Sequence, residues 1–171
     1  MGTKIAEPVW DPIDPDVDLH VPAQRRELAR SHGGVLVVIA AGGGLGALAR
    51  YGLGRAWPTP AGGFPWATFT VNVVGCLLIG VLMVLISEVG VGPRQGVGNK
   101  RAWVAHPLAR PFLGVGVLGG FTTFSTYADE VRDLLRPGTA PLAFGYLAGT
   151  VLGALLAVLA GVRLTRAATG R

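Results

Sequence analysis

The sequence GGFTTFSTY, residues 119–127, decides the fold of this protein. Each of its two glycines weakens a helix by about 1 kcal/mol relative to alanine. Five hydroxyl groups and three aromatic rings lie within the seven residues that follow them. In a membrane, a broken helix is tolerated only where the freed backbone groups are buried in protein or line a wet cavity. Half-helix ends at the membrane midplane also build ion sites. The run therefore indicates ion handling inside a membrane.

The rest of the chain has the composition of a membrane protein. Half of its 171 residues are hydrophobic, 27 are glycine, and the mean hydropathy is +0.49. About 20 apolar residues are enough to cross a bilayer as a helix. Four stretches contain no Asp, Glu, Lys or Arg: 31–49, 56–87, 111–128 and 137–162. The chain is therefore predicted to be an all-α membrane protein with four transmembrane helices.

The expected helices follow from these runs and from the breakers around them. The proline cluster at 58–65 precedes the second helix, and the third is expected to break near Gly119-Gly120. Small residues spaced four apart let helices approach closely, and they recur in the first helix and again in the fourth. The expected bounds are 34–53, 66–89, 111–135 and 140–164. The small residues are Gly42 and Gly46, then Gly145, Gly149, Gly153, Ala157 and Gly161.

The two ends of the chain differ from its middle. Residues 1–33 are rich in proline and acidic residues, which predicts a disordered tail. A four-helix domain is expected over 34–165, followed by a short C-terminal tail at 166–171. Lys and Arg gather on the side of the termini and in the loop 90–110, so both termini are predicted to be cytoplasmic in a multi-pass protein of the cell membrane. The pI of about 10.1 does not indicate nucleic-acid binding, since these charges flank apolar runs.

Several polar residues lie within the expected spans. Asn72 could form an interhelical hydrogen bond, or it could offer its amide N–H to an ion path. Phe124 and Tyr127 lie on one helical face, where a positive ring edge could meet an anion that has lost water. Arg50, at the end of the first helix, could snorkel to the headgroups or make an aqueous vestibule positive.

No pattern for catalysis or for binding a metal through side chains is present. The three histidines have no suitable partner spacing, so the chain is not expected to be an enzyme. The lone Cys76 cannot form a disulfide within the chain and is expected to be a small packing residue.

These residues resemble the CrcB/Fluc family of fluoride channels. The run 119–127 with Glu130 after it resembles the family's third helix, which is the most specific of the matches. The segment Thr70-x-Asn72-x-x-Gly75 is similar to the second helix, and 42–51 to the first. The match covers about 34–165 in the right order. Position 127 is Tyr where the family usually has Phe.

The resemblance implies a fold and a set of site residues. Family members are antiparallel dimers of four-helix subunits with two fluoride pores and a structural sodium ion at the dimer centre, so the domain at 34–165 would be a channel domain. The sodium would lie on the backbone carbonyls of Gly119 and Thr122. Thr70 and Glu130 match a vestibule, to which Arg50 could belong. The fluoride path would be formed by Asn72, Phe124, Ser125, Thr126 and Tyr127, with Tyr146 and Thr150 behind them.

The sequence thus predicts a channel that exports fluoride passively. Its partner would be a second, antiparallel copy or an oppositely oriented paralogue, within a lipid bilayer. The alternatives are a small four-helix multidrug exporter and a scaffold without transport activity. An exporter needs a titratable carboxylate inside the membrane, and the expected first, second and fourth spans contain none. A scaffold has no need of the helix break or the hydroxyl run.

Overall fold

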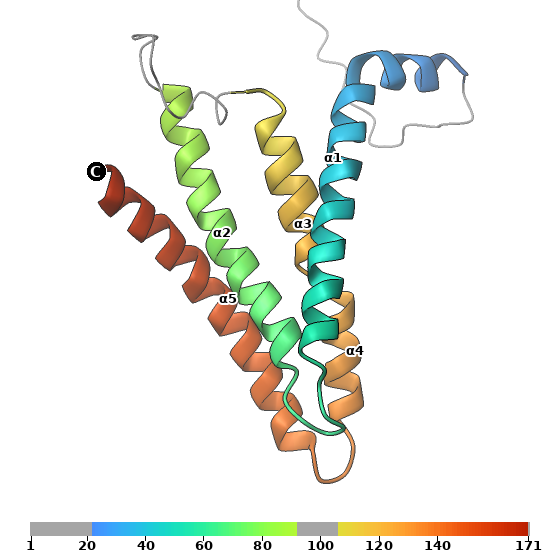
Figure 1. Cartoon of the computed structure of the whole chain (residues 1–171), viewed down its shortest axis with the longest axis vertical. Coiled ribbons are helices and arrows are strands. Elements are labelled where there is room, and N and C mark those ends of the chain that lie inside the picture. The colour runs from blue at the N-terminus through green and yellow to red at the C-terminus, as the bar shows by residue number, and fades with distance from the viewer. Residues whose placement is uncertain (1–21, 92–105, 171) are drawn as a thin grey trace, which may run out of the picture. The chain divides into compact units, whose positions relative to one another are not determined.

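The computed structural model describes residues 22–91 and 106–170, and within these ranges all of the regular structure is helical (Figure 1). The prediction of an all-α protein is confirmed. The elements are α1 Pro22–Ala56, α2 Trp66–Val91, a π-helical segment η1 Arg110–Leu118, α3 Gly119–Phe121, α4 Ser125–Leu134 and α5 Ala140–Thr169.

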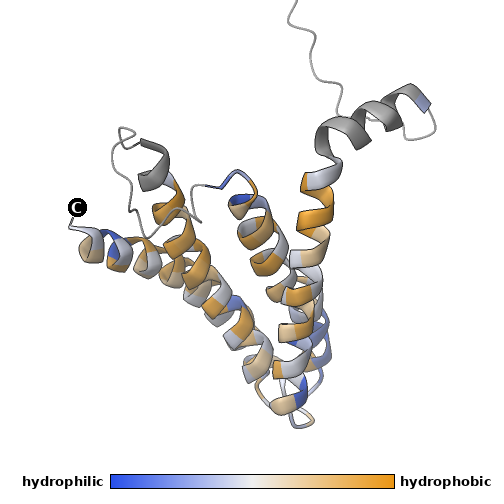
Figure 2. Ribbon diagram, turned by 45° about the horizontal axis from the view of Figure 1, so that its top comes forward, coloured by the Kyte–Doolittle hydropathy of each residue, from blue (hydrophilic) through white to orange (hydrophobic). Residues whose placement is uncertain are grey.

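Three of these helices are long and apolar enough to cross a membrane. The apolar segments are Gly33–Ala56 in α1, Trp66–Ser87 in α2 and Ala140–Thr169 in α5. Hydrophobic residues run along all three (Figure 2). Each corresponds to one of the four spans expected from the sequence. The expected third span is divided among η1, α3 and α4.

The first helix starts earlier than expected. It begins at Pro22 rather than near Gly34, so the second part of the expected tail, 22–33, is helical. Among the described residues, one unit of the chain ends at Gly34 and a second begins at Val35. Residues 1–21 and most of the loop 90–110 lie outside the described residues.

Glycines bring α1 against η1 and α3. A Cβ added at Gly42 would lie 2.5 Å from the carbonyl oxygen of Phe112, and one at Gly116 would lie 2.9 Å from that of Ile39. A Cβ at Gly46 or Gly120 would also run into the backbone of the facing helix. The close approach expected around Gly42 and Gly46 is therefore confirmed.

Glycines also join α2 to α5, although not along the whole predicted stripe. A Cβ at Gly161 would meet the Leu77 carbonyl, and Gly153 lies against Val73. Gly145 and Gly149, in contrast, face open space. Within the described residues the stripe is therefore not one continuous packing face, because Gly145 and Gly149 meet no neighbouring atoms.

The helix break begins two residues after the glycine pair at which it was expected. Gly119 and Gly120 are helical, whereas Thr122 is extended, with φ −77° and ψ 159°, and α4 begins only at Ser125. The glycine pair therefore does not break the helix by itself. Gly120 instead lets α3 approach the backbone of α1 at Gly43.

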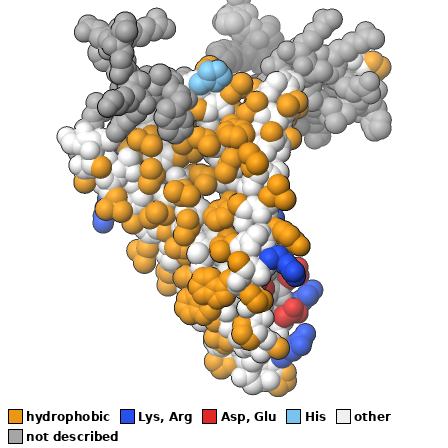
Figure 3. Space-filling model, in the orientation of Figure 1, with side chains coloured by type: hydrophobic (Ala, Val, Ile, Leu, Met, Phe, Trp, Pro, Cys, Tyr) orange, Lys and Arg blue, Asp and Glu red, His pale blue; other side chains and the backbone are white. Residues whose placement is uncertain are grey.

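Beyond the break, α4 has one buried and one charged side. Tyr127 and Val131 pack with Tyr146 of α5 in a buried cluster. On the opposite side, Arg132 pairs with Asp129 at 3.4 Å, and each of these side chains is more than half exposed. In Figure 3, acidic and basic side chains gather in one small area of a largely hydrophobic surface. Such exposed pairs contribute little to stability.

Candidate functional site

The break between α3 and α4 is held by one side chain of α2. Asn72 Nδ2 donates to the Thr123 carbonyl at 3.0 Å, and Asn72 Oδ1 accepts the Thr123 N–H at 2.9 Å. Asn72 is only 8 % exposed. It therefore satisfies both backbone groups of a residue that no longer takes part in a helix, as buried polar groups require.

Thr123 in turn caps the start of α4. Its hydroxyl oxygen accepts the Thr126 N–H at 3.2 Å and donates to the Thr126 hydroxyl at 3.1 Å. The Ser125 hydroxyl lies 3.4 Å away. A side-chain oxygen that accepts an N–H of the first turn is the usual way to satisfy the start of a helix.

These two contacts leave two carbonyls without their helical partners. In a continuous helix, Gly119 would accept the N–H of Thr123, and Thr122 would accept that of Thr126. Those N–H groups go instead to Asn72 and to the Thr123 hydroxyl. Among the backbone hydrogen bonds described outside the helices, none reaches either carbonyl. They are the two carbonyls that the resemblance assigns to a cation.

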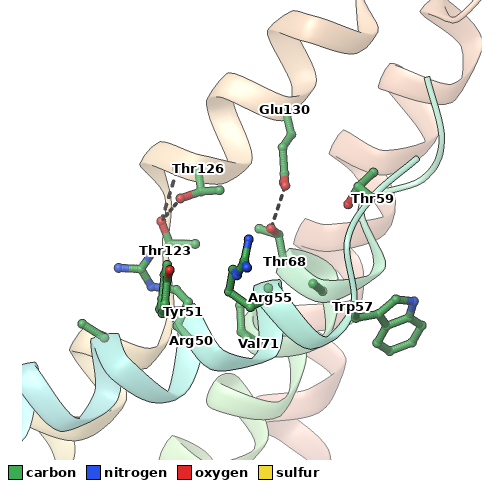
Figure 4. A pocket seen from close by; sticks show the side chains of 13 residues that line it. Arg50, Tyr51, Arg55, Trp57, Thr59, Thr68, Val71, Thr123, Thr126 and Glu130 are labelled. Carbon is green, nitrogen blue, oxygen red and sulfur yellow. Dashed lines mark hydrogen bonds between the residues drawn. The ribbon is translucent and has the colours of Figure 1, made fainter. Parts of the chain in front are cut away.

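A cavity of about 400 Å³ lies on one side of the break; we call it the Arg50 cavity. Arg50 and Arg55 face it from α1, Glu130 from α4 and Thr68 from α2 (Figure 4). The full lining is Ala47, Arg50, Tyr51, Gly54, Arg55, Trp57, Thr59, Ala67, Thr68, Val71, Thr123, Thr126 and Glu130. Two guanidinium groups against one carboxylate make this cavity favourable for anions.

Arg50 is held at the helix break rather than extended to a membrane surface. Its Nε donates to the carbonyl of Gly120 at 3.2 Å, which links α1 to the end of α3. A charged donor strengthens such a bond. Of the two roles left open by the sequence, lining a vestibule and snorkelling to headgroups, this contact favours the first.

Glu130 is linked to two other helices by hydroxyl groups. Thr68 donates to its Oε1 at 2.8 Å, and Tyr146 donates to its Oε2 at 2.7 Å. Thr68 and Tyr146 are buried, and Tyr146 is fully inaccessible. The structure thus brings Thr68 to the Arg50 cavity, whereas Thr70, which was predicted to lie at a vestibule, does not line it. Two residues apart on a helix, these threonines point in nearly opposite directions.

A second cavity of about 400 Å³ lies on the other side of Thr123; we call it the Phe124 cavity. It brings together Asn72, Phe124, Tyr127 and Thr150, four residues of the predicted fluoride path. It also includes both predicted sodium ligands. The full lining is Asn72, Cys76, Gly119, Thr122, Thr123, Phe124, Tyr127, Thr150, Val151 and Ala154. Thr126 lines the Arg50 cavity instead, and Ser125 and Tyr146 line neither of these two cavities.

Two residues of the Phe124 cavity have unusual surroundings: one is an exposed aromatic ring, and the other is a buried hydroxyl. The Phe124 ring is 79 % exposed although it lies in the middle of the chain's apolar part. Thr150 is only 5 % exposed, and its hydroxyl has no hydrogen-bond partner among the described residues. A buried hydroxyl without a partner is costly.

The hydroxyl of Tyr127 already donates a hydrogen bond within the chain. It donates to the Leu147 carbonyl of α5 at 2.9 Å, and the side chain is 8 % exposed. The ring itself stacks edge-on against Tyr146, with centroids 5.2 Å apart, and lies 6.0 Å from Phe124. The phenol therefore positions the ring between α4 and α5 and does not extend into the cavity as a free donor.

Comparison with known proteins identifies the family. The family described as "CrcB-like protein, Camphor Resistance (CrcB)" matches residues 37–162, which is most of the chain. The chain belongs to the CrcB family. As a CrcB protein with three apolar helices of membrane-spanning length, it is a multi-pass membrane protein.

Curated relatives of this CrcB chain carry names that state a function. A "Fluoride-specific ion channel FluC 2" of Nocardia farcinica is 57 % identical over 80 % of this chain and 88 % of its own length. The "Fluoride-specific ion channel FluC 1" of Streptomyces coelicolor is 51 % identical over 82 % of each chain. The "Fluoride-specific ion channel FluC" of Rhodospirillum centenum is 42 % identical over 78 % of this chain and 97 % of its own. These names describe ion channels and not enzymes.

Two residues that line these cavities were not assigned a role from the sequence. Thr68 lies four residues before Asn72, so both lie on one face of the helix. This spacing is a signal from which Thr68 could have been predicted. Thr123 was included in the hydroxyl run without a role of its own. It lines both cavities and caps α4. Its hydrogen bond with Asn72, which lies 51 residues away along the chain, is evident only from the structure.

Proposed function

We propose that this chain is a subunit of a fluoride-selective channel that exports fluoride passively. The observation that carries this proposal is the Phe124 cavity. An amide, a buried hydroxyl without a partner and an exposed ring converge there, and no lining residue is charged. Selectivity for an ion requires groups that replace its hydration shell. Neutral N–H and O–H donors and positive ring edges suit a small hard anion.

The route of the ion follows from the two cavities. Thr123 lines both, so an anion drawn to Arg50 and Arg55 would pass it to reach Asn72 and Phe124. Hydrogen fluoride enters a cell as a neutral molecule and ionises at neutral pH. A negative interior then drives the anion outward without another energy source.

The segment 110–135 would be the remaining transmembrane span, the third in chain order. It would cross the membrane as two half-helices around the break. The N-terminus of α4 carries a partial positive charge, and it begins beside the Phe124 cavity. Irregular backbone at membrane depth is tolerated beside such a cavity. The contacts of Asn72 and Thr123 support this arrangement, because they satisfy backbone groups that lipid would leave unpaired.

Reconstitution of the pure protein into liposomes tests the proposed function. Fluoride efflux that follows an imposed membrane potential, with little chloride efflux, is expected for a channel. A multidrug exporter would instead move organic cations in exchange for protons, and a scaffold would move neither. The names of the relatives favour the channel, and Glu130 is the one acid in either cavity that could serve an exporter. Proton-coupled cation transport without fluoride efflux would overturn the proposal.

Replacing Tyr127 by Phe should preserve fluoride efflux within a few-fold of the wild type. The ring remains, and only the hydrogen bond to Leu147 is lost. Such a bond contributes about 0.5–1.5 kcal/mol to stability, so the melting temperature in detergent should fall slightly. Efflux and melting measured on the same preparation check both parts. A severe loss of efflux in a protein that still folds would show that the hydroxyl takes part in conduction.

We further propose a structural sodium ion on the carbonyls of Gly119 and Thr122. Both carbonyls have lost their helical N–H partners, and oxygen ligands suit a hard cation. When bound, the ion would supply a fixed positive charge beside the anion path. Replacing sodium by a larger monovalent cation throughout purification and assay should lower fluoride efflux. Readdition of sodium serves as the control, and unchanged efflux after thorough removal would contradict the site.

The dimer would be antiparallel, and its second subunit would be an oppositely oriented paralogue. The exposed Phe124 ring supports a partner that completes the path. Ten Lys and Arg lie on the side of the termini, without counting Lys4, and four lie on the other side. Such a bias orients a membrane protein, whereas an antiparallel homodimer needs one chain to insert both ways.

Expression of this chain alone, with a reporter at its C-terminus, tests the orientation. A fixed cytoplasmic C-terminus is expected in cells that lack the paralogue. Equal signals from both sides of the membrane, together with fluoride efflux, would favour a homodimer and reject the heterodimer. That result would mean that the charges in the tail and in the loop 90–110 lie too far from the spans to determine the orientation of the chain in the membrane.

A further inference from the structure

Two tryptophans are exposed at the end of the helix bundle where α1 connects to α2. Trp57 follows the last residue of α1 and is 46 % exposed, and Trp66 is the first residue of α2 and is 50 % exposed. Their rings are stacked within 11° of parallel, with centroids 6.4 Å apart. The indole of Trp57 points away from Arg50 and Glu130 (Figure 4). Large rings held outside the core indicate contact with something other than water.

Phe64 attaches this tryptophan pair to the core of the bundle. The centroid of its ring lies 4.5 Å from that of Trp66 and 5.2 Å from that of Tyr146. Tyr146 is fully inaccessible, and its ring also packs against that of Tyr127. The pair is therefore packed onto the helices, so the depth at which it lies is the depth of the bundle itself.

Charged residues lie at the same end of the bundle. Arg55 precedes Trp57 by two residues. Asp133 and Arg136, near the end of α4, line a cavity of about 290 Å³ together with Pro60 of the loop between α1 and α2. Tryptophan beside charged groups is typical of a membrane–water interface, where the ring lies among apolar chains and its N–H meets the polar headgroups.

We propose that Trp57 and Trp66 form an anchor in the phospholipid headgroup layer, which fixes how deeply the bundle lies in the bilayer. The length of α2 supports this placement. Its apolar segment Trp66–Ser87 has 22 residues. At 1.5 Å per residue it is about 33 Å long, close to the hydrocarbon thickness of about 30 Å. With Trp66 at one boundary, Ser87 lies at the other.

The anchor places the Arg50 cavity and the helix break at different depths. Arg50 lies seven residues before Trp57 on α1, which is about 10 Å along the helix. Gly75, against which Thr122 packs, lies nine residues after Trp66 on α2, which is about 14 Å. The midplane of the bilayer is about 15 Å from the boundary. The Arg50 cavity therefore lies between the headgroups and the midplane, and the break lies near the midplane.

Depth-dependent fluorescence quenching tests the anchor on the full-length protein in liposomes of phosphatidylcholine and phosphatidylglycerol. The chain has four tryptophans, so Trp10→Phe and Trp103→Phe leave the pair as the only indoles. Further replacement of Trp57 or Trp66 by Phe leaves one. A nitroxide on the lipid headgroup should quench the pair, and each member alone, at least about twofold more than a nitroxide near the methyl end of the acyl chain. Iodide in the water should quench them weakly.

A tryptophan placed deeper in the bilayer is the matched control. Leu78 lies twelve residues after Trp66 on α2 and is 42 % exposed, which puts it about 18 Å from the boundary along the helix. Leu78→Trp, in a chain whose own four tryptophans are replaced by Phe, should show the reverse order of quenching. Elution as a single species controls for the folding of each variant.

Three results would overturn the inference. Stronger quenching of the pair by the methyl-end nitroxide would place it in the hydrocarbon core. Iodide quenching as strong as that of a free tryptophan amide would place it in water. Protection from both the lipid nitroxides and iodide would show that a protein partner covers it. No fluoride enters this measurement, so its outcome is independent of the proposed function.

Discussion

Replacing Asn72 by Asp should abolish fluoride efflux from liposomes while the protein remains folded. Asn72 contacts both backbone groups of Thr123 and also lines the Phe124 cavity. The carboxylate would lose the donor to the Thr123 carbonyl and place a negative charge beside the anion path. Two unit charges about 5 Å apart repel by about 3 kcal/mol at an effective dielectric of about 20. That energy corresponds to a factor of roughly 100 in flux.

A matched variant separates charge from hydrogen bonding at this position. Asn72→Leu has a similar volume and no charge but loses both bonds to Thr123. If Asp abolishes efflux and Leu only lowers it, the charge dominates; equal losses would indicate that holding the helix break is what matters. Elution as a single species by size-exclusion chromatography controls for folding. Efflux near the wild-type rate with Asp would leave Asn72 as an interhelical hydrogen bond alone.

Replacing Phe124 by Ile should block most of the fluoride efflux without disturbing assembly of the subunit. The ring is 79 % exposed, so little of the packing within the chain depends on it. Ile keeps apolar bulk but has no positive ring edge. Edge contacts of aromatic rings are worth about 0.5–1.5 kcal/mol, and the upper value is about a tenfold change in flux. The change should be measured as the initial rate of efflux.

The corresponding control is Phe144→Ile on α5. Phe144 is also strongly exposed, at 65 %, but lines neither the Arg50 cavity nor the Phe124 cavity. It should conduct at close to the wild-type rate. If both variants conduct normally, Phe124 is a packing residue at a subunit or lipid contact, and the ring-edge argument fails. Equal losses in both would indicate a general effect of removing surface rings.

The helices were largely predictable because their signals are local. The start of α2 at Trp66 and that of α5 at Ala140 agree with the expected bounds, since proline and glycine precede both. Span length follows from counting apolar residues against the thickness of a bilayer. The start of α1 at Pro22 was not predicted, because the acidic and proline-rich composition before it pointed to a disordered tail.

The position of the helix break was not predictable from the glycines. Gly119 and Gly120 have weak helix propensity, yet they remain helical. The break occurs at Thr122 to Phe124, where Asn72 offers a competing donor and acceptor for Thr123. Intrinsic propensity amounts to about 1 kcal/mol per glycine, and tertiary hydrogen bonds and packing easily outweigh it.

The sequence by itself determined that this chain is helical, that it belongs in a membrane, and which run carries the helix break. These properties depend on composition and on spacing within single helices. Only the tertiary structure decided that Thr68 reaches Glu130, that the Tyr127 hydroxyl is occupied, and that Cys76 shares a cavity with Thr150. The partners in these contacts lie between 20 and 74 residues apart along the chain, so packing alone determines which side chains meet.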